Sequence, residues 1–230
     1  MAGALVTAKK ELRKKIKLIL KELPENAAAS QTSNATKTLL SMPEYKAARR
    51  ISVYLSMPGG EISTTNIVRD ALEQGKKVFI PYTYKLTSPQ DGRPKSIMDM
   101  VELQSFKDFE SLDSDNWGIP TPSKDSISSR ANCFGSVGVT DGETVNSSEG
   151  LDLIVMPGMA FDLEFGRLGH GKGFYDFFLS RCHNASHMPF RVGLSLTEQL
   201  LSSENVPMGP YDYRLDALIT GDGTLRRASS

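Results

Sequence analysis

The chain has 230 residues, carries 27 Lys and Arg against 27 Asp and Glu, and contains two cysteines. It is long enough to bury a core without disulfides or a structural metal, and its balanced charge excludes a general attraction to nucleic acid or to an acidic membrane. Cys133 and Cys182 form no Cys-x-x-Cys pair, which argues against a disulfide scaffold or a zinc site and for a reducing compartment.

The N-terminal segment is predicted to be an amphipathic helix. Leu12, Ile16, Ile19 and Leu23 recur at helical spacing between basic residues, and Pro24 ends the pattern. The sequence has no apolar run of about 18 residues and no signal-peptide core, so we expect a soluble, cytoplasmic protein. Because basic segments that are nearly free of acidic residues also occur in transit peptides, a mitochondrial location is the alternative.

A second helix is expected over about residues 26–42, before a first β–α–β unit. The strand within RRISVYLSMPGGE runs into a Pro-Gly-Gly loop that ends on Glu61. A helix over about 63–74 follows, Gly75 stops it, and KKVFIP is predicted to be the next strand.

The periodicity weakens between Tyr84 and Gly150. SIMDMVEL is compatible with a strand and NWGIPTP with a bend. The Ser-rich stretch 123–149 is predicted to be a long exposed loop and a flexible insertion, since long loops of compact domains are commonly mobile.

The C-terminal third alternates strands and helices. LDLIVMP is an almost continuous apolar run, as in strands buried on both faces of a parallel sheet. A helix over about 171–182, the strand FRVGLSL, a short helix near Thr197 and the strand DALITG follow. This order predicts a single α/β domain over 1–230: a three-layer, open, mostly parallel sheet with helices on both faces, Rossmann-like and related to phosphate-binding isomerase and transferase scaffolds.

The stretch GRLGHGKGFYD, residues 166–176, is a candidate anion site. Three glycines before a helix leave main-chain amides free to surround phosphate oxygens at the positive end of the helix dipole, and Arg167 and Lys172 add charge. The spacing fits neither established phosphate-loop pattern, so a tight strand-to-helix connection with solvated basic residues is the alternative.

Other polar residues could serve the same site. Asp176 in the following helix suits magnesium, which prefers one or two carboxylates together with phosphate oxygens, and Asp216 before the last strand is a weaker second candidate. Asp176 could instead stabilise the helix N-terminus. Lys9 and Arg13 share a helix face and could close over a triphosphate or be solvated, and Glu61 is either a substrate acceptor or a turn residue.

Taken in order along the chain, these motifs are similar to one known family. A basic helix with Lys9 and Arg13, followed by YLSMPGGEI, FIP, WGIPTP, DLIVMPGMAFD and GRLGHGKGFYD, resembles the 5-formyltetrahydrofolate cyclo-ligases over nearly the whole chain. The resemblance implies ATP- and magnesium-dependent closure of 5-formyltetrahydrofolate to 5,10-methenyltetrahydrofolate. The γ-phosphoryl group activates the formyl oxygen, N10 attacks, and ADP and phosphate leave. Positioning and charge neutralisation supply most of such catalysis.

The resemblance also assigns roles by position. For ATP it implies Lys9, Arg13, Arg167, Leu168, Gly169, His170, Gly171, Lys172, Gly173, Phe174 and Tyr175. For the folate it implies Leu55, Met57, Glu61, Trp117, His170, Gly171, Lys172, Gly173 and Phe174. The catalytic residues would be Lys172, Arg167 and Tyr175, and the magnesium ligands Asp176 and Asp216.

The expected partners are ATP and a reduced folate, polyglutamated or not, with no nucleic acid and no membrane, and the chain is expected to be a monomer. Two residues depart from the family pattern. His170 stands where arginine is common and brings a group that titrates near neutrality, and Phe174 stands where tyrosine is frequent.

Two other functions remain open at this point. The first is a folate-binding module without turnover, which would have no use for Lys172 beside Asp176. The second is a sugar-phosphate isomerase or CoA-transferase relative on the same kind of scaffold, which would need a carboxylate base and no ATP. Dependence on ATP separates these alternatives from the cyclo-ligase.

Overall fold

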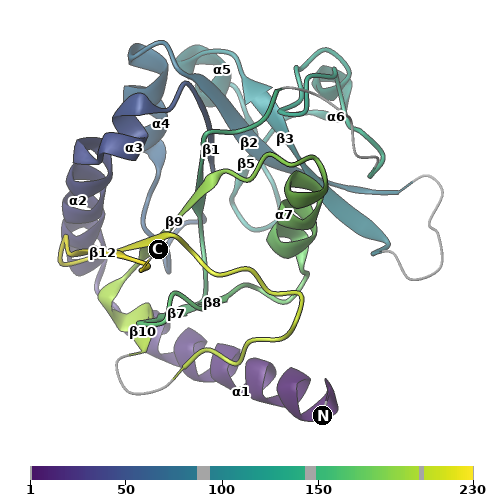
Figure 1. Cartoon of the computed structure of the whole chain (residues 1–230). Helices are drawn as coiled ribbons and strands as arrows, with labels where there is room; N and C mark the ends of the chain where they lie inside the picture. The colour runs from purple at the N-terminus through teal and green to yellow at the C-terminus, as the bar shows by residue number, and fades with distance from the viewer. Residues whose placement is uncertain (1, 87–93, 143–148, 202–204, 230) are drawn as a thin grey trace.

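The structure is a computed structural model and describes residues 2–86, 94–142, 149–201 and 205–229. Its centre is a seven-stranded sheet in the order β12-β11-β9-β6-β1-β2-β3 (Figure 1). The two edge strands, β3 and β12, are antiparallel to their neighbours, and all other pairs are parallel. The predicted open, mostly parallel sheet is confirmed. Its strands are β1 (Arg50–Val53), β2 (Lys77–Lys85), β3 (Ser96–Leu103), β6 (Leu153–Met156), β9 (Phe190–Ser195), β11 (Ala217–Thr220) and β12 (Leu225–Arg227).

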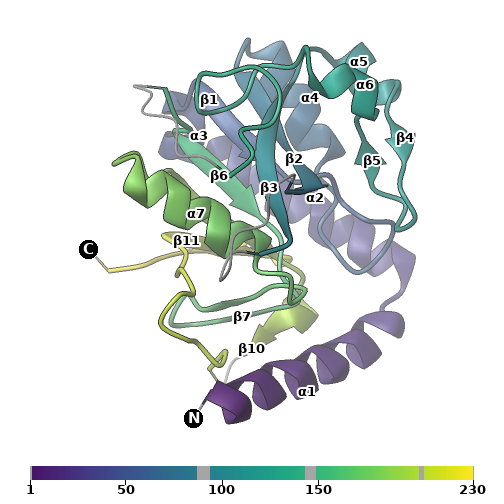
Figure 2. The same ribbon diagram turned by 90° about the vertical axis from the view of Figure 1, so that its right-hand side faces the viewer.

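Helices cover both faces of this sheet (Figure 2). On one face, Ile67 of α4 packs in the same buried cluster as Ile51 of β1, and on the other, Phe178 of α7 packs with Ile154 of β6. None of the described helices is long and apolar enough to cross a membrane. The helices are α1 (Ala2–Lys21), α2 (Glu25–Ser41), α3 (Pro43–Ala47), α4 (Thr65–Glu73), α5 (Phe106–Glu110), α6 (Lys124–Ile127), α7 (Phe174–Asn184) and the single turn η1 (Thr197–Gln199).

The N-terminal helix α1 packs on a second, small sheet. This sheet has the order β10-β7-β8, from β10 (Leu200–Leu201), β7 (Ala160–Asp162) and β8 (Arg167–Leu168). Leu12 and Ile16 of α1 are buried against Ala160 and Leu168, as the helical spacing predicts, whereas Ile19 is 40% exposed. The small sheet was not predicted, because strands of two or three residues carry no detectable alternation.

Two boundaries differ from the prediction for identifiable reasons. β2 continues to Lys85 through Pro81, which is possible because β1 pairs with β2 only as far as Phe79, so the missing N–H of proline interrupts no bond to β1. Helix α7 begins at Phe174 rather than near residue 171, because Gly173 caps it with a positive φ of 69°.

The expected exposed loop over 123–149 is wrong for much of its described part. Residues 124–127 form α6, and Arg130, Asn132, Cys133 and Phe134 are buried. A short antiparallel bridge joins Asn132 to Val101 of β3. The polar Ser-rich composition hid an inward-facing segment of few residues, and residues 143–148 of the predicted loop lie outside the described part of the chain.

One buried ion pair fastens this segment to the sheet. Arg181 of α7 donates to Asp99 of β3 at 2.6 Å, and the Asp99 carboxylate also accepts from the main-chain N–H of Thr140 at 2.6 Å. Tyr84 and Asn132 donate to the same carboxylate at 3.1 and 3.3 Å. Because a buried charge is tolerated only when it is paired and hydrogen-bonded, this network holds β2, β3, α7 and residue 140 together.

Candidate active site

The candidate site is built from loops that leave the carboxyl ends of β1 and β6. The chain after β1 forms the Gly-Gly loop, which we define as residues 56–61. The chain after β6 passes through the β7–β8 hairpin into the glycine-rich loop, residues 169–173, and then into α7. Because β1 and β6 are adjacent and parallel, both loops emerge on the same edge, where ligands of open α/β sheets bind.

Asp162 shapes the hairpin that leads to the glycine-rich loop. Its buried carboxylate accepts from the main-chain N–H groups of Glu164 (2.9 Å), Gly166 (2.7 Å) and Val206 (2.6 Å). Phe165 takes a positive φ of 62° in this turn, and a Cβ at Gly166 would stand 2.6 Å from the Asp162 carboxylate. The turn therefore requires glycine at 166 and fixes the direction in which the next residue, Arg167, points.

Arg167 is buried and only partly satisfied. Its side chain is 3% exposed, and its guanidinium makes contacts of 3.3 Å to the carbonyl of Pro157 and to the carboxylate of Asp176. The guanidinium also lies over the ring of Tyr175, 5.3 Å from the centroid, and its Nε has no partner among the described residues. A Cβ at Gly169 would stand 2.9 Å from Nη1, so glycine is needed there to admit the arginine.

Helix α1 reaches the glycine-rich loop through Arg13, whereas Lys9 contacts Asp212 in the segment before β11. Arg13 donates from Nε to the carbonyl of Gly169 at 2.8 Å, and its guanidinium lies 3.1 Å from where a Cβ of Gly171 would be. Burial lowers the pKa of Arg13, and the negative charge of Asp212 acts in the opposite direction. Lys9 pairs with Asp212. The solvated-face alternative for these two residues is therefore wrong, because both side chains are held by contacts across the site.

Glu61 places a buried carboxylate between the two loops. Its side chain is 7% exposed, one oxygen accepts from the N–H of Met57 at 3.3 Å, and the other lies 3.3 Å from Nε2 of His170. Tyr54 and Tyr175 are close enough for this carboxylate to act on them: burial is the main cause that raises the pKa of each hydroxyl, and Glu61 raises both further. Both hydroxyls therefore stay protonated.

The predicted magnesium ligands do not come together. Asp176 faces the site, where it accepts from Arg167 and, at 3.2 Å, from the N–H of Tyr213. Asp216 precedes β11 and so lies at the amino end of the parallel strands, where Arg191 donates to it from Nε at 2.8 Å and from Nη2 at 2.5 Å. Within the described ranges, no cluster of three or more His, Cys, Asp or Glu side chains could hold a metal ion. Of the two predicted ligands, Asp176 lies at the candidate site and Asp216 does not.

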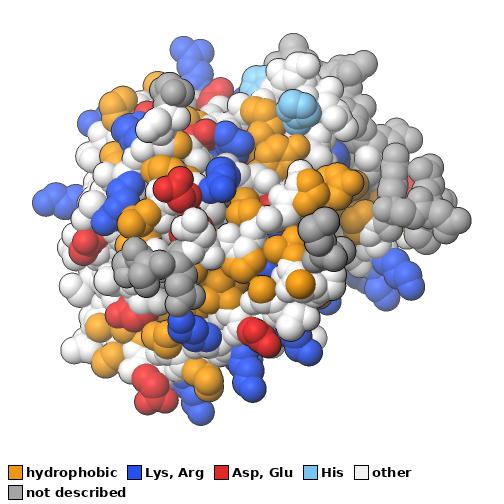
Figure 3. Space-filling view, turned by 60° about the horizontal axis from the view of Figure 1, so that its bottom comes forward, with side chains coloured by type: hydrophobic (Ala, Val, Ile, Leu, Met, Phe, Trp, Pro, Cys, Tyr) orange, Lys and Arg blue, Asp and Glu red, His pale blue; other side chains and the backbone are white. Residues whose placement is uncertain are grey.

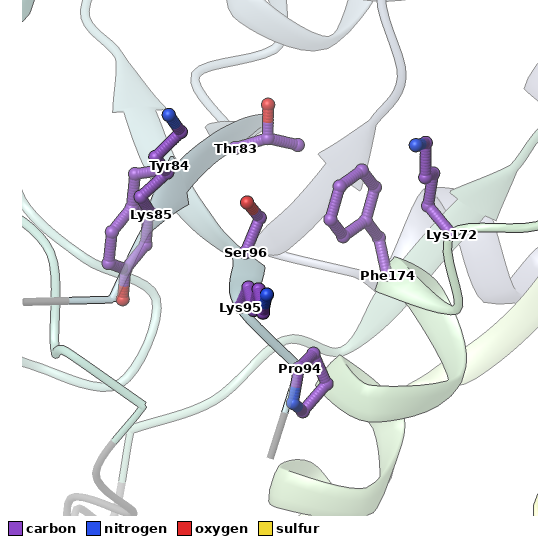
Figure 4. Close-up of a pocket in the computed structure, with 8 residues that line it drawn as sticks. All are labelled: Thr83, Tyr84, Lys85, Pro94, Lys95, Ser96, Lys172 and Phe174. Atoms are coloured by element: carbon purple, nitrogen blue, oxygen red, sulfur yellow. The ribbon is translucent and has the colours of Figure 1, made fainter. Parts of the chain in front are cut away.

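A pocket of about 470 Å³ opens beside the glycine-rich loop. Phe174 and Lys172 form one side of it, and residues from the β2–β3 hairpin form the other (Figure 4). Tyr84 donates from its hydroxyl to buried Asp99 at 3.1 Å. The other hairpin residues that line the pocket are Thr83, Lys85, Pro94, Lys95 and Ser96, so three lysines border it, with Lys172 counted among them. Sequence reasoning missed the hairpin lysines, since nothing in the spacing links residues 85 and 95 to residue 172.

Trp117, the only tryptophan of the chain, lies next to the Gly-Gly loop. It sits in the turn between β4 (Asp113–Ser114) and β5 (Pro120–Thr121) and is 72% exposed. A Cβ at Gly118 would stand 2.8 Å from the ring of Pro58, so the turn packs directly on that loop. Leu55, another residue predicted to bind the folate, is buried between β1 and the Gly-Gly loop. Seen from the side of α1, hydrophobic side chains gather across the centre of the surface, with Lys and Arg side chains around them (Figure 3).

Comparisons with known proteins identify the family of the chain. A model of the 5-formyltetrahydrofolate cyclo-ligase family matches residues 6–221. A probable 5-formyltetrahydrofolate cyclo-ligase of Schizosaccharomyces pombe is 31% identical over 224 residues, which cover 95% of this chain and 97% of the relative. The mouse 5-formyltetrahydrofolate cyclo-ligase is 31% identical over 217 residues, covering 94% and 95%.

A solved structure is also similar to this chain. The NMR structure of Aquifex aeolicus 5,10-methenyltetrahydrofolate synthetase superposes with a TM-score of 0.66 at 26% identity, covering 96% of this chain and 93% of that one. The match thus extends from the N-terminal helix through β11. The predicted family is confirmed: the chain belongs to the 5-formyltetrahydrofolate cyclo-ligase family.

Proposed function

We propose that the protein catalyses the ATP- and magnesium-dependent cyclisation of 5-formyltetrahydrofolate to 5,10-methenyltetrahydrofolate. One observation carries the proposal: the segments after β1 and β6 bring a buried carboxylate, Glu61, next to the glycine-rich loop, which contains Lys172 and directly follows the strand of Arg167. A carboxylate suits the donor groups of a pterin, and the glycine-rich loop suits the phosphates of a nucleotide. The relatives carry names of this activity.

The nucleotide would lie on the glycine-rich loop. The main-chain amides of Gly169, Gly171 and Gly173 offer donors to the phosphate oxygens, and Lys172 adds a charge. The incompletely bonded guanidinium of Arg167 would move from its 3.3 Å contacts onto the transferring phosphoryl group. Charge on the three equatorial oxygens of that group is what the protein must stabilise.

Asp176 is the residue that would hold magnesium, because it follows the glycine-rich loop and its side chain is 23% exposed. The ion would neutralise part of the phosphate charge when bound. Asp216 is not included in this proposal, because both of its oxygens are bound to Arg191 at the far edge of the sheet. The single carboxylate is sufficient, since magnesium commonly keeps several waters and takes its other ligands from phosphates.

The folate would lie against the Gly-Gly loop and the turn that carries Trp117, which packs on that loop. Glu61 would accept from the amino and amide groups of the pterin, which requires His170 to leave its 3.3 Å contact with the carboxylate. Trp117 would stack on an aromatic ring of the substrate, and Leu55 and Met57 would support the folate site. The Tyr175 hydroxyl stays protonated and would act as a hydrogen-bond donor rather than as a base.

The lysine pocket beside Phe174 would take the glutamate end of the folate. Lys85, Lys95 and Lys172 line a pocket of about 470 Å³. Carboxylates are the part of a reduced folate that lysine side chains recognise. A polyglutamate tail would extend this contact. We expect the double variant Lys85→Ala/Lys95→Ala to raise KM for a polyglutamated substrate more than KM for the monoglutamate.

An absorbance assay tests the proposal directly. The protein is incubated with 5-formyltetrahydrofolate, with and without ATP and magnesium, and the formation of the methenyl product is followed. We expect product only when both ATP and magnesium are present. Equal rates without ATP would reject the cyclo-ligase and favour the isomerase alternative, and quenching of Trp117 fluorescence by the folate without product would favour a binding module.

A further inference from the structure

Gln199 is a fully hydrogen-bonded amide in the interior, next to the candidate site. It is 1% exposed and ends η1, the turn after β9. Its Oε1 accepts from the N–H of Leu196 at 2.9 Å. Its Nε2 donates to two carbonyls, that of Gly158 at 2.8 Å and that of Gly60 at 3.2 Å. A buried amide group is tolerated when each of its donors is hydrogen-bonded, and both amide hydrogens of Gln199 are bonded here.

The two carbonyls belong to the two segments that leave the carboxyl ends of β1 and β6. Gly60 lies in the Gly-Gly loop directly before Glu61, the buried carboxylate. Gly158 follows Pro157, whose own carbonyl accepts from Arg167 at 3.3 Å. The two hydrogens of an amide nitrogen lie in one plane at a fixed angle, so a single side chain sets where these two backbone segments stand relative to each other.

The turn that carries Gln199 is itself anchored. Gln31 of α2 donates to the carboxylate of Glu198 at 3.0 and 3.2 Å, and its Oε1 accepts from the N–H of Thr197 at 2.7 Å. η1 is thereby attached to a helix that packs on the central sheet. Gln199 can therefore act as a fixed point for the two loops, rather than moving with them.

We propose that Gln199 is a positioning residue that holds Glu61 and Arg167 at the spacing that the two substrates require. Gln199 has no polar atom left to bind a substrate, because the oxygen and the nitrogen of its side chain are both bonded to the main chain. The consequence for catalysis rests on the proposed function, whereas the coupling of the two loops does not. Loss of the amide should loosen both loops together, because each loses a bond to the same nitrogen.

Hydrogen–deuterium exchange of the full-length chain tests the coupling without any substrate. Gln199→Leu keeps the side chain similar in size and leaves the carbonyls of Gly60 and Gly158 unpaired. We expect exchange in peptides covering 57–61 and 158–162 to accelerate about 10-fold in both, the effect of roughly 1.4 kcal/mol in a local opening equilibrium. Acceleration in one loop only, or a uniform change across the chain, would overturn the proposal.

A matched control removes a buried hydrogen bond elsewhere. Tyr45→Phe deletes the hydroxyl that donates to Asp70 at 2.6 Å, in a fully buried residue of α3. It should lower the melting temperature without changing exchange in either loop. Should Gln199→Leu fail to fold, Gln199→Met, which is unbranched like glutamine, carries the same measurements.

Kinetics separate positioning from a purely structural role. In Gln199→Leu we expect KM for 5-formyltetrahydrofolate and KM for ATP both to rise about 10-fold at the same active-enzyme concentration, because both loops are displaced. A structural role alone would reduce the active fraction and leave both KM values unchanged. If the native chain shows no ATP-dependent turnover, the proposed function fails while the exchange result still decides the coupling. An active native chain with unchanged KM values in the variant rejects the positioning role.

Discussion

Charged side chains lie at both ends of the parallel strands, which we call the amino edge and the carboxyl edge of the central sheet. Both edges carry arginine and aspartate, but they differ in how completely these charges are bonded. At the amino edge, Arg191 donates to Asp216 through two nitrogens at 2.8 and 2.5 Å. Asp152 accepts from the main-chain N–H groups of Arg49 and Arg50 at 2.7 and 2.8 Å. The pocket there, about 880 Å³, is the larger of the two described, so size does not identify the site.

At the carboxyl edge, the bonds of Arg167 and Glu61 are long or missing. Arg167 makes its two hydrogen bonds at 3.3 Å and leaves Nε unpaired among the described residues, and both contacts of Glu61 are also 3.3 Å. Catalytic hydrogen bonds are commonly long before substrate binds and shorten in the complex. Paired charges therefore hold the amino edge together, whereas Arg167 and Glu61 at the carboxyl edge keep bonding capacity for a ligand.

The largest effect is expected when Arg167, the arginine of the carboxyl edge, is replaced. Arg167→Lys keeps the charge but loses the planar fork, and we expect kcat to fall about 100- to 1,000-fold, the usual loss for a transition-state donor. Arg191→Lys is the matched control at the amino edge and should leave kcat unchanged. Steady-state kinetics of both variants check this, and equal losses would remove the distinction between the edges.

A second effect concerns the charge on the glycine-rich loop. Lys172→Ala is expected to weaken ATP affinity by about 1.5–3 kcal/mol, the range for a hydrogen bond to a charged group. Calorimetric titration with a non-hydrolysable ATP analogue measures it. Unchanged affinity would assign Lys172 to the lysine pocket alone, and KM for the folate would then be the parameter that rises.

A third effect separates the two predicted metal ligands. Asp176→Asn removes the negative charge beside the glycine-rich loop. The magnesium concentration needed for half-maximal rate should rise about 10-fold, because a charged ligand of the ion is lost. Magnesium titrations of the native chain and the variant measure this shift. The same magnesium curve in both would exclude Asp176 as a ligand.

The smallest effect is expected at the amino edge. Asp216→Asn should lower the free energy of unfolding by about 1 kcal/mol, because the partly exposed pair with Arg191 is screened by solvent. The magnesium requirement should not change. Urea unfolding and the magnesium titration measure the two quantities, and a raised magnesium requirement would restore Asp216 to the metal site.

How far the site could be predicted depends on whether its contacts are local. Arg167, Lys172 and Asp176 fall within one short motif, so spacing alone placed them on one loop and helix. Lys85 and Lys95 join them only because the β2–β3 hairpin packs beside α7, and Gln199 only because η1 ends between two loops. Asp216 was assigned to the metal by its place before a strand, but that place is at the amino edge of the sheet.

The sequence by itself determined the alternation of strands and helices, the mostly parallel sheet and the glycine-rich loop, because apolar periodicity and glycine placement act within a few neighbouring residues. Tertiary structure alone decided which charged groups are paired with each other and which keep bonding capacity. Pairing depends on distances between segments far apart in the chain, such as Glu61 and His170, or Arg13 and Gly169. Those distances are set by the packing of the sheet, α1 and η1, and no local pattern encodes them.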